Sequence, residues 1–298
     1  MQADPHFFLG VDGGATRCRA RLRDAAGALL ADIEGPAANI YVDFDGAIAN
    51  ARAQIDGVYA KAGLDDAAHA RTALGLGLAG LSSPEDAQRV EAQFAAMSGV
   101  RAANDAVTAC LGAHGGADGA LVIAGTGSAA VARARGLESV IGGRGFLLGD
   151  DGSAARVGAD AVRAGLRAHD GLGPVSPMTQ EIMRRFDNDP LLAIQWAIGA
   201  KPSGYGAFAP LVFESAGAGD AVALAIVAAA AQAVDALIRA AQALGAERVV
   251  LVGGLSQPLK PYLDAASQAA LRRPLFDAVD GAILLAGGVL PVGETRER

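Results

Sequence analysis

Apolar and polar positions alternate along the first part of the chain in the manner of β-strands. The alternation predicts strands over residues 6–11, 17–24 and 29–34. Ala25-Ala26-Gly27 separates the second strand from the third and is typical of a hairpin turn. We therefore expect an antiparallel opening, not a strand–helix–strand unit.

From about residue 45 the spacing of apolar residues changes and predicts helices that alternate with buried strands. Ser83 followed by Pro84 is a typical helix start, an N-cap followed by proline at the first helical position. The elements predicted here are a helix over 45–62, a strand over 73–78, a helix from 83 to 97, a short strand ending at 104 and a helix over 106–113.

The second half repeats the opening pattern of a strand, a glycine turn and a further strand. We predict strands over 119–124, 129–134, 138–141 and 248–252, and helices over 153–169, 177–186, 190–198, 220–244 and 280–290. A domain boundary near His114 gives an N-terminal domain of residues 1–114 and a C-terminal domain of residues 115–298. The last helix could pack back on the N-terminal domain.

Composition narrows the classes of protein. The chain has 298 residues, of which 52% are hydrophobic, enough for a large core or for two domains. Its net charge of −7, with scattered basic residues, argues against nucleic-acid binding. Cys18 and Cys110 are the only cysteines, which excludes a cysteine-ligated zinc site and indicates reduced thiols in the cytoplasm.

No targeting segment or membrane span is predicted. The polar start lacks a basic flank, and the apolar run over residues 221–231 is rich in alanine and continues into polar positions. We interpret this run as a buried helix, and we expect a cytoplasmic protein with no membrane partner.

Two turns carry the pattern of a phosphate cradle, each an apolar strand running into glycine, threonine or serine. Such turns expose backbone N–H groups and leave room for an anion to approach. The residues are Gly13, Gly14, Ala15 and Thr16 in the first turn, and Gly125, Thr126, Gly127 and Ser128 in the second. With a lone acid between them, they predict a nucleotide held in a cleft between two domains.

Asp12 precedes the first turn and could hold Mg²⁺ through water, while Thr16 could donate to a phosphate oxygen. The alternative is an ordinary hairpin with a turn-favouring aspartate. The second turn also imitates a dinucleotide fingerprint, but a strand rather than a helix follows it. We therefore disfavour a dinucleotide site.

Asp105 is the candidate general base, since a kinase acting on a hydroxyl needs a carboxylate to accept its proton. The alternative is that Asp105 only caps the helix starting at Ala106. The loop over residues 142–153 combines glycines, Arg144 and two acids, as a site for a polyhydroxylated ligand would. Gly253 and Gly254, after a late strand, would allow close approach of a ring or ribose, or form a plain turn.

Taken in order, these motifs resemble the actin-like sugar kinases of the BadF/BadG and N-acetylglucosamine kinase group, over essentially the whole chain. Within that group the chain is most similar to bacterial glucosamine kinases. The resemblance to the whole group is carried by residues 12–16, 38–39, 104–106, 125–128, 142–153, 253–254 and 280–282. The resemblance to the glucosamine kinases is carried by residues 18–21, 109–114, 205–208 and 276–278.

The resemblance implies an α/β, two-domain actin-like ATPase (ribonuclease H-like) fold that binds ATP and Mg²⁺. It implies Asp105 as the base that activates the 6-hydroxyl of glucosamine. The remaining roles are sugar binding by Asn39, Asp105, Gly143, Arg144 and Asp150, metal positioning by Asp12, phosphate binding by the two turns, and adenosine binding by Gly253, Gly254 and Ser256.

The chain departs from the group at three positions. Ala15 stands where a third glycine is usual, Asp151 where glutamate is common, and Arg144 where animal N-acetylglucosamine kinases have tryptophan. The last departure weakens the case for stacking on the sugar or its acetyl group.

Three functions remain open at this point. The first is a hexosamine kinase for glucosamine, with N-acetylglucosamine as the alternative and a homodimer as a plausible state. The second is a BadF/BadG-type ATPase that activates another enzyme through an iron–sulfur cluster, for which Cys18 and Cys110 form no clustered motif. The third is a sugar-responsive binding module without catalysis, against which the intact Asp105 argues.

Overall fold

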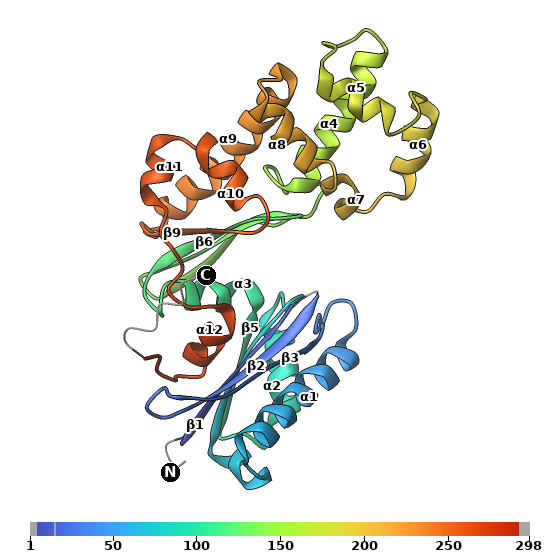
Figure 1. The fold of residues 1–298 in the computed structure, drawn as a ribbon. Coiled ribbons are helices and arrows are strands. Elements are labelled where there is room, and N and C mark those ends of the chain that lie inside the picture. The colour runs from blue at the N-terminus through green and yellow to red at the C-terminus, as the bar shows by residue number, and fades with distance from the viewer. Residues whose placement is uncertain (1–4, 15, 292–298) are drawn as a thin grey trace. The chain divides into compact units, whose positions relative to one another are not determined.

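A computed structural model describes residues 5–14 and 16–291. The chain divides into two compact units. The first comprises the residues up to 118 together with those from 273 onward, and the second comprises residues 119–272 (Figure 1). The last helix therefore belongs to the first unit.

The first unit is built on a five-stranded mixed sheet in the order β3-β2-β1-β4-β5. The first three strands pair antiparallel, as the alternation predicts, whereas β1, β4 and β5 run parallel. The strands are β1 (Phe7–Gly13), β2 (Arg17–Asp24), β3 (Leu29–Pro36), β4 (Thr72–Leu78) and β5 (Gly99–Asn104).

Helices cover both faces of this sheet. Helix α1 packs its apolar side, including Ile48 and Ile55, against Leu9, Val11 and Leu22 on one face, while α3 and α12 lie on the other. The helices are α1 (Phe44–Ala62), α2 (Pro84–Glu91), α3 (Asp105–Ala113) and α12 (Ala278–Leu285), with short 3₁₀ turns η1 (Asp66–Arg71) and η2 (Ala92–Phe94).

Two predicted helices of the first unit end several residues earlier than expected. The helix expected to reach residue 97 is α-helical only to Glu91 and continues as the short turn η2. The helix expected over 280–290 is α12, which begins after Asp277 because that carboxylate caps it, and ends before Gly287, whose φ of +87° no helix can continue.

Glycines let α3 and α12 approach the sheet and each other closely. A Cβ added at Gly75 of β4 would lie 1.8 Å from the carbonyl oxygen of Ala282. A Cβ added at Gly281 of α12 would lie 1.8 Å from the carbonyl oxygen of Thr108 on α3. These contacts join the last helix of the chain to a sheet formed more than 150 residues earlier, so local sequence alone cannot reveal them.

The second unit is built on a four-stranded sheet in the order β8-β7-β6-β9. The strands β6 (Gly119–Ala124), β7 (Ser128–Ala134) and β8 (Leu137–Gly142) form an antiparallel meander, and β9 (Val249–Val252) pairs parallel with β6. The helices are α4 (Ala154–His169), α5 (Pro177–Arg184), α6 (Pro190–Gly199), α7 (Pro202–Gly206), α8 (Ala209–Gly217), α9 (Ala221–Ala243), α10 (Ser256–Leu259), α11 (Ala265–Ala270) and the 3₁₀ turn η3 (Lys260–Tyr262). Helices α7, α8, α10 and α11 were not predicted from the sequence.

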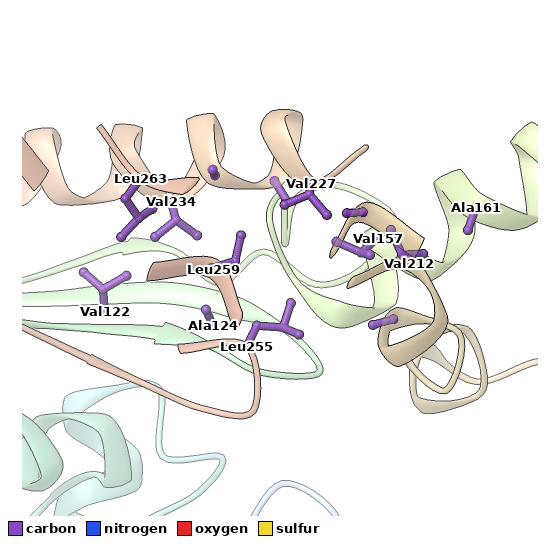
Figure 2. Packing of buried hydrophobic residues seen from close by; sticks show 14 of the residues in the cluster. Val122, Ala124, Val157, Ala161, Val212, Val227, Val234, Leu255, Leu259 and Leu263 are labelled. Atoms are coloured by element: carbon purple, nitrogen blue, oxygen red, sulfur yellow. The ribbon is translucent and has the colours of Figure 1, made fainter. Parts of the chain in front are cut away.

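Helix α9 lies along the sheet of the second unit. Among the described residues it is the one helix long and apolar enough, by length and composition, to cross a membrane. In the structure Val227, Val234 and Ile238 are fully buried, and Figure 2 shows Val234 above Val122 of β6. Burying each such side chain stabilises the fold by about 1.5–3 kcal/mol, so α9 acts here as a core helix.

Candidate functional site

The parallel strands of the first unit end at one edge of the sheet, and three predicted site residues gather there. The pairing places Gly13, Leu78 and Asn104 in one row across β1, β4 and β5. Asp12 precedes this row by one residue and Asp105 follows it by one. Ligands in open α/β sheets bind outside the carboxyl ends of such strands.

The first glycine turn follows β1 directly. Gly13 lies in the strand, where a Cβ would come within 2.5 Å of the Leu78 side chain, so packing already requires a glycine. The turn closes where the N–H of Gly14 donates to the carbonyl of Arg17 at 2.9 Å. A Cβ added at Gly14 would meet only the carbonyl oxygen of Arg17, at 3.5 Å, and Thr16 is exposed. Ala15, also predicted to bind phosphate, lies outside the described residues.

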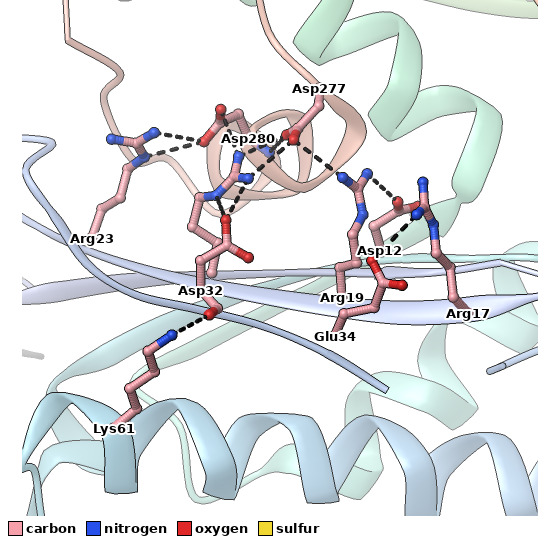
Figure 3. A network of polar contacts seen from close by, with 10 residues as sticks. Asp12, Arg17, Arg19, Arg23, Asp32, Glu34, Lys61, Asp277 and Asp280 are labelled. Carbon is pink, nitrogen blue, oxygen red and sulfur yellow. Dashed lines mark hydrogen bonds and ion pairs between the residues drawn. The ribbon is translucent and has the colours of Figure 1, made fainter. Parts of the chain in front are cut away.

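Asp12 is engaged by a cation of the neighbouring strand. Its Oδ2 accepts a hydrogen bond of 2.8 Å from Nη2 of Arg19, and 18% of its side chain is exposed (Figure 3). Hydrogen bonds and ion pairs of the described residues leave Oδ1 unused. Asp12 therefore keeps one oxygen for a ligand.

Asp105 is the first residue of α3 and not its cap. Asn104 is the N-cap, since its Oδ1 accepts from the N–H of Ala106 at 3.0 Å while its amide donates to the carbonyl of Leu81 at 2.9 Å. One oxygen of Asp105 also accepts from Ala106 N–H, at 2.9 Å. The expectation that Asp105 itself caps the helix is thus wrong, because Asn104 fills that role one residue earlier.

Burial and the charge of Asp12 both act on Asp105. Burial raises the pKa of the Asp105 carboxyl above its ordinary value, and the negative charge of Asp12 raises the pKa further, against the hydrogen bond from Ala106. A carboxyl with a raised pKa in this position is suited to accept a proton.

Asn39 is held in a defined orientation at the same edge. Its backbone bridges to Ala79, the residue after β4, and its Oδ1 accepts from the N–H groups of Tyr41 and Val42 at 3.0 and 3.3 Å. The carbonyl end of the amide is therefore occupied. The NH₂ end has no partner among the described residues and can donate to a ligand.

In the second unit, the turn after β6 is anchored by its carbonyl groups. The carbonyls of Gly125 and Thr126 accept from the N–H groups of Ala154 and Ala155, at the start of α4, at 2.8 and 3.3 Å. With the carbonyls held by the helix, the N–H groups of Thr126 and Gly127 make no hydrogen bond within the part of the chain that the structure describes. Two backbone donors side by side suit an anion.

The loop over residues 142–153 is tied to this turn. Ser128 is buried, its hydroxyl donates to the carbonyl of Asp151 at 2.7 Å, and its carbonyl accepts from Gly143 N–H at 3.1 Å. The Asp150 carboxylate lies against Gly127, where a Cβ would come within 2.8 Å of Oδ2. The Ser128 hydroxyl is thus already used in a hydrogen bond within the protein. The Asp150 carboxylate lies next to the backbone donors of the turn.

Arg144 is exposed, as are several other residues of this loop, among them Leu147 and Leu148. No ion pair is recorded for it among the described side chains, and its Cβ lies close to Gly149 within the loop. The structure thus brings Gly143 and Asp150 to the turn by direct contacts and gives Arg144 no such contact.

Gly253 and Gly254 follow β9, the parallel neighbour of β6. A Cβ at Gly253, whose φ is +100°, would lie 2.4 Å from the carbonyl oxygen of Ala124 and 3.0 Å from the nitrogen of Gly125. A Cβ at Gly254 would meet nothing within 4 Å. The predicted adenosine and phosphate residues of this unit are therefore adjacent, with Gly254 facing open space and Ser256 starting α10.

The donor set at Asp12 fits magnesium. The described residues hold no group of three histidine, cysteine or acidic side chains that could form a metal cage. Magnesium keeps several waters and is bound through one or two carboxylates together with substrate phosphates. A single carboxylate with a free oxygen beside an open glycine turn matches that mode of binding.

The partners of Asp12 were not predicted as site residues. Arg19 and Asp277 belong to stretches that carry the family resemblance, and Arg19 pairs with both Asp12 and Asp277. The available signal was the alternation of arginines at 17, 19, 21 and 23, which places four cations on one face of a strand.

The comparisons with known proteins identify the family of the chain. The model of the BadF/BadG/BcrA/BcrD ATPase family matches residues 9–286. The chain belongs to this family. The resemblance inferred from the ordered motifs is thereby confirmed.

Relatives of this BadF/BadG/BcrA/BcrD family member carry kinase names. Glucosamine kinase GspK of Vibrio cholerae is 32% identical over 282 residues, covering 95% of this chain and 96% of that protein. N-acetyl-D-glucosamine kinase of Dictyostelium discoideum is 30% identical over 252 residues, covering 78% of each chain.

A solved structure shows the same fold. A Chromobacterium violaceum protein, solved as a candidate N-acetylglucosamine kinase, matches with a TM-score of 0.81 and 32% identity over 95% of this chain and 99% of that chain. The predicted fold class, the α/β actin-like ATPase fold of sugar kinases, is confirmed.

Proposed function

We propose that this family member is an ATP-dependent hexosamine kinase that transfers the γ-phosphoryl group of ATP to the 6-hydroxyl of glucosamine. The name of the Vibrio cholerae relative supports the reaction class and the sugar. One observation carries the assignment to this chain. Asp105, with its raised pKa, stands at the ligand edge of the first sheet beside Asp12 and has no ion pair with a described cation.

The roles of the first unit follow from its carboxylates and amide. Asp105 would accept the proton of the attacking hydroxyl, and its raised pKa makes it a better acceptor than an ordinary aspartate. The free NH₂ group of Asn39 would donate to a sugar hydroxyl, since its other end is fixed by the backbone. Fixing the sugar in this way would hold its hydroxyl in the orientation needed for reaction, which lowers the entropic part of the barrier.

The roles of the second unit are mainly those of backbone donors. The N–H groups of Thr126 and Gly127 would bind phosphate oxygens, where negative charge increases during transfer. Asp150, in contact with Gly127, would accept from a sugar hydroxyl close to those phosphates. Gly254 would leave room for the adenosine.

Asp12 would hold magnesium through its free oxygen, directly or through water. Bound magnesium supplies positive charge that neutralises the phosphate oxygens. The chain itself contributes the orientation of that carboxylate, which Arg19 fixes from the other side.

N-acetylglucosamine is the second candidate substrate. The names of the Dictyostelium discoideum and Chromobacterium violaceum proteins favour it. The ATPase-activator alternative is disfavoured by the thiols: Cys18 and Cys110 are both buried, and burial raises the pKa of Cys18 to about 12, which keeps that sulfur protonated.

The test is ATP consumption by the purified protein with Mg²⁺ and one of several sugars: glucosamine, N-acetylglucosamine, glucose, N-acetylmannosamine or none. We expect turnover with glucosamine and a product phosphorylated at the 6-position, read by ³¹P and ¹³C NMR. Faster turnover with N-acetylglucosamine would assign the second candidate. Hydrolysis that is independent of sugar, or no turnover at all, would reject the kinase proposal.

A further inference from the structure

Strand β2 carries a row of arginines on one face. Because side chains alternate along a strand, the residues at 17, 19, 21 and 23 all point to the same side. Arg17 is exposed and pairs with Glu34, whereas Arg21 and Arg23 are 1% and 2% exposed and pair with acids of α12 and β3. Arg19 lies between these two environments.

Arg19 joins two carboxylates with two different nitrogens. Nη2 contacts Asp12 at 2.8 Å, and Nη1 contacts Asp277 at 3.3 Å (Figure 3). Its side chain is only 19% exposed. The planar guanidinium fixes both contacts at once, which a flexible point charge cannot do.

Asp277 is itself held from two further directions. It caps α12, accepting from the N–H of Asp280 at 3.1 Å, and it pairs with Arg21 at 2.7 Å. Arg21 in turn contacts Asp32 and the buried Asp280. The chain of contacts from α12 to Asp12 therefore contains no freely rotating member.

We propose that Arg19 is a positioning residue for Asp12, with Asp277 acting through it. The pair holds one oxygen of Asp12 and would leave the other oxygen free to bind magnesium. Magnesium demands near-ideal octahedral geometry, so a carboxylate free to rotate would hold it less well. The inference rests on the proposed role of Asp12, but it concerns nucleotide and metal binding and not the identity of the sugar.

A purely structural role makes a different prediction. If Arg19 only stabilised the sheet, its removal would lower the unfolding temperature and leave the folded protein with normal metal and nucleotide binding. Its buried Nε finds no hydrogen-bond partner among the described residues, so stability alone accounts poorly for an arginine at this position.

The experiment compares Arg19→Met, Arg19→Lys and Asp277→Asn with Arg17→Met as the matched control. Arg17 lies on the same face of the same strand, and its ion pair with Glu34 is exposed. Asparagine at 277 keeps the capping ability but loses the charge. Each variant is measured for binding of Mn²⁺ with ADP by electron paramagnetic resonance, for kcat and KM against Mg²⁺, and for unfolding temperature.

For Arg19→Met we expect Mn²⁺·ADP affinity and kcat each to fall about 10–100-fold, as for other groups that orient a metal ligand, with the KM for sugar unchanged. Arg19→Lys and Asp277→Asn should show smaller losses of the same kind, and Arg17→Met none. Arg19→Lys and Asp277→Asn decide the question if Arg19→Met does not fold.

Metal binding and kcat within twofold of the unaltered chain in every folded Arg19 and Asp277 variant would overturn the proposal. Failure of the proposed function is distinguishable, because Mn²⁺·ADP binding is measured without any sugar. A protein that phosphorylates no hexosamine but loses Mn²⁺·ADP binding in Arg19→Met would retain this inference alone.

Discussion

Both units place a glycine turn at the end of a central strand, but one sheet face of the first unit carries buried ion pairs, whereas α9 of the second unit covers its sheet with apolar side chains. In the first unit Arg21 and Arg23, on the sheet face toward α12, both pair with Asp280 of α12, and all three side chains are at most 2% exposed. In the second unit α9 covers the sheet with alanine, valine and isoleucine, as at Val227 and Val234.

This difference between buried ion pairs and an apolar core corresponds to the chemical groups with which each unit would bind a ligand. The first unit presents carboxylates, Asp12 and Asp105, and a carboxylate that must keep its charge in a half-buried place needs nearby cations or hydrogen bonds. The second unit offers mainly backbone N–H groups at Thr126 and Gly127. These need only a turn of the right shape, which an apolar core can hold.

The largest effect is expected at Asp105. Replacing it by asparagine should lower kcat about 10²–10⁴-fold, the usual contribution of a general base, with ATP and sugar affinities changed only a few-fold. Steady-state kinetics and calorimetric binding would measure this. Asp45→Asn, an exposed acid in the first turn of α1, is the control and should keep full activity. Substantial transfer by Asp105→Asn would remove Asp105 as the base.

The same variant should unfold at a higher temperature at neutral pH. Burial raises the pKa of Asp105 in the folded chain, so its stabilising contribution exists only below its ordinary pKa and is lost as the pH rises through the folded value. At pH 7 the ionised carboxylate of Asp105 therefore destabilises the folded state, and asparagine avoids this destabilisation because it carries no charge. An unchanged or lower melting temperature would contradict this.

The second effect compares the adjacent glycines after β9. Gly253→Ala should destabilise the fold by about 1–3 kcal/mol, because it strains a φ of +100° and drives a Cβ into the carbonyl of Ala124. Gly254→Ala meets no atom and should change the stability by less than about 0.5 kcal/mol. Urea denaturation measures both. Equal destabilisation would show that the turn is not built on this close approach.

The third effect is acid sensitivity, which should differ in sign between two particular acids, Asp277 of the first unit and Asp160 of the second. Burial alone would raise the pKa of Asp277, but the hydrogen bond and charge of Arg21 outweigh it and hold that pKa below its ordinary value. Asp277 therefore stabilises the fold above its ordinary pKa of about 4, and this contribution is lost as the pH falls through the lower, folded value.

The matching acid of the second unit is Asp160 on α4, whose pKa is raised by burial first. As the pH falls from 6 to 3, a range that roughly spans ordinary carboxyl pKa values, Asp277→Asn should lose less stability than the unaltered chain, and Asp160→Asn should lose more. Chemical denaturation at several pH values measures both slopes. Identical slopes in the two variants would show that the ion pairs of the first unit do not set its acid response.

The smallest effect concerns Asp150, which adopts a left-handed φ of +57°. Asp150→Gly should relieve about 1 kcal/mol of strain while raising the KM for sugar, because the proposed acceptor is lost. Asp187→Gly, at a φ of +52° in the α5–α6 connection, is the control and should gain stability without a change in KM. Loss of stability in Asp150→Gly would mean that its carboxylate contributes more to the fold than the strain costs.

Much of the fold was predictable because its signals are local. Alternation over residues 17–24 predicted β2, Ser83-Pro84 predicted the start of α2, and both glycine turns lie where the strands end. Helices α7, α10 and α11 were not predicted because elements of four to six residues carry too little periodicity to stand out. Helix α8 was not predicted either, although it has nine residues, as many as the predicted α3. Ring contacts support part of this region, as between Trp196 and Phe208.

At the site, the predicted residues were of the right chemical kind, but their surroundings were not predictable. That Asn104 and not Asp105 caps α3 depends on one rotamer and one hydrogen bond. That the Ser128 hydroxyl is committed to Asp151 depends on the path of a 12-residue glycine loop, of residues 142–153. Neither follows from spacing, because side-chain hydrogen bonds select among conformations that the sequence permits equally.

By itself the sequence determined the family, the α/β class, the two glycine turns and the acids Asp12 and Asp105. These features depend on residue types at neighbouring positions, because the geometry of a strand or turn directly fixes where such residues lie. Only the tertiary structure decided that Arg19 links Asp12 to Asp277, across more than 250 residues of chain. Such a contact forms because glycines let α12 pack closely against the first sheet. The charged side chains on that face are then buried, and a buried charge is costly unless it is paired.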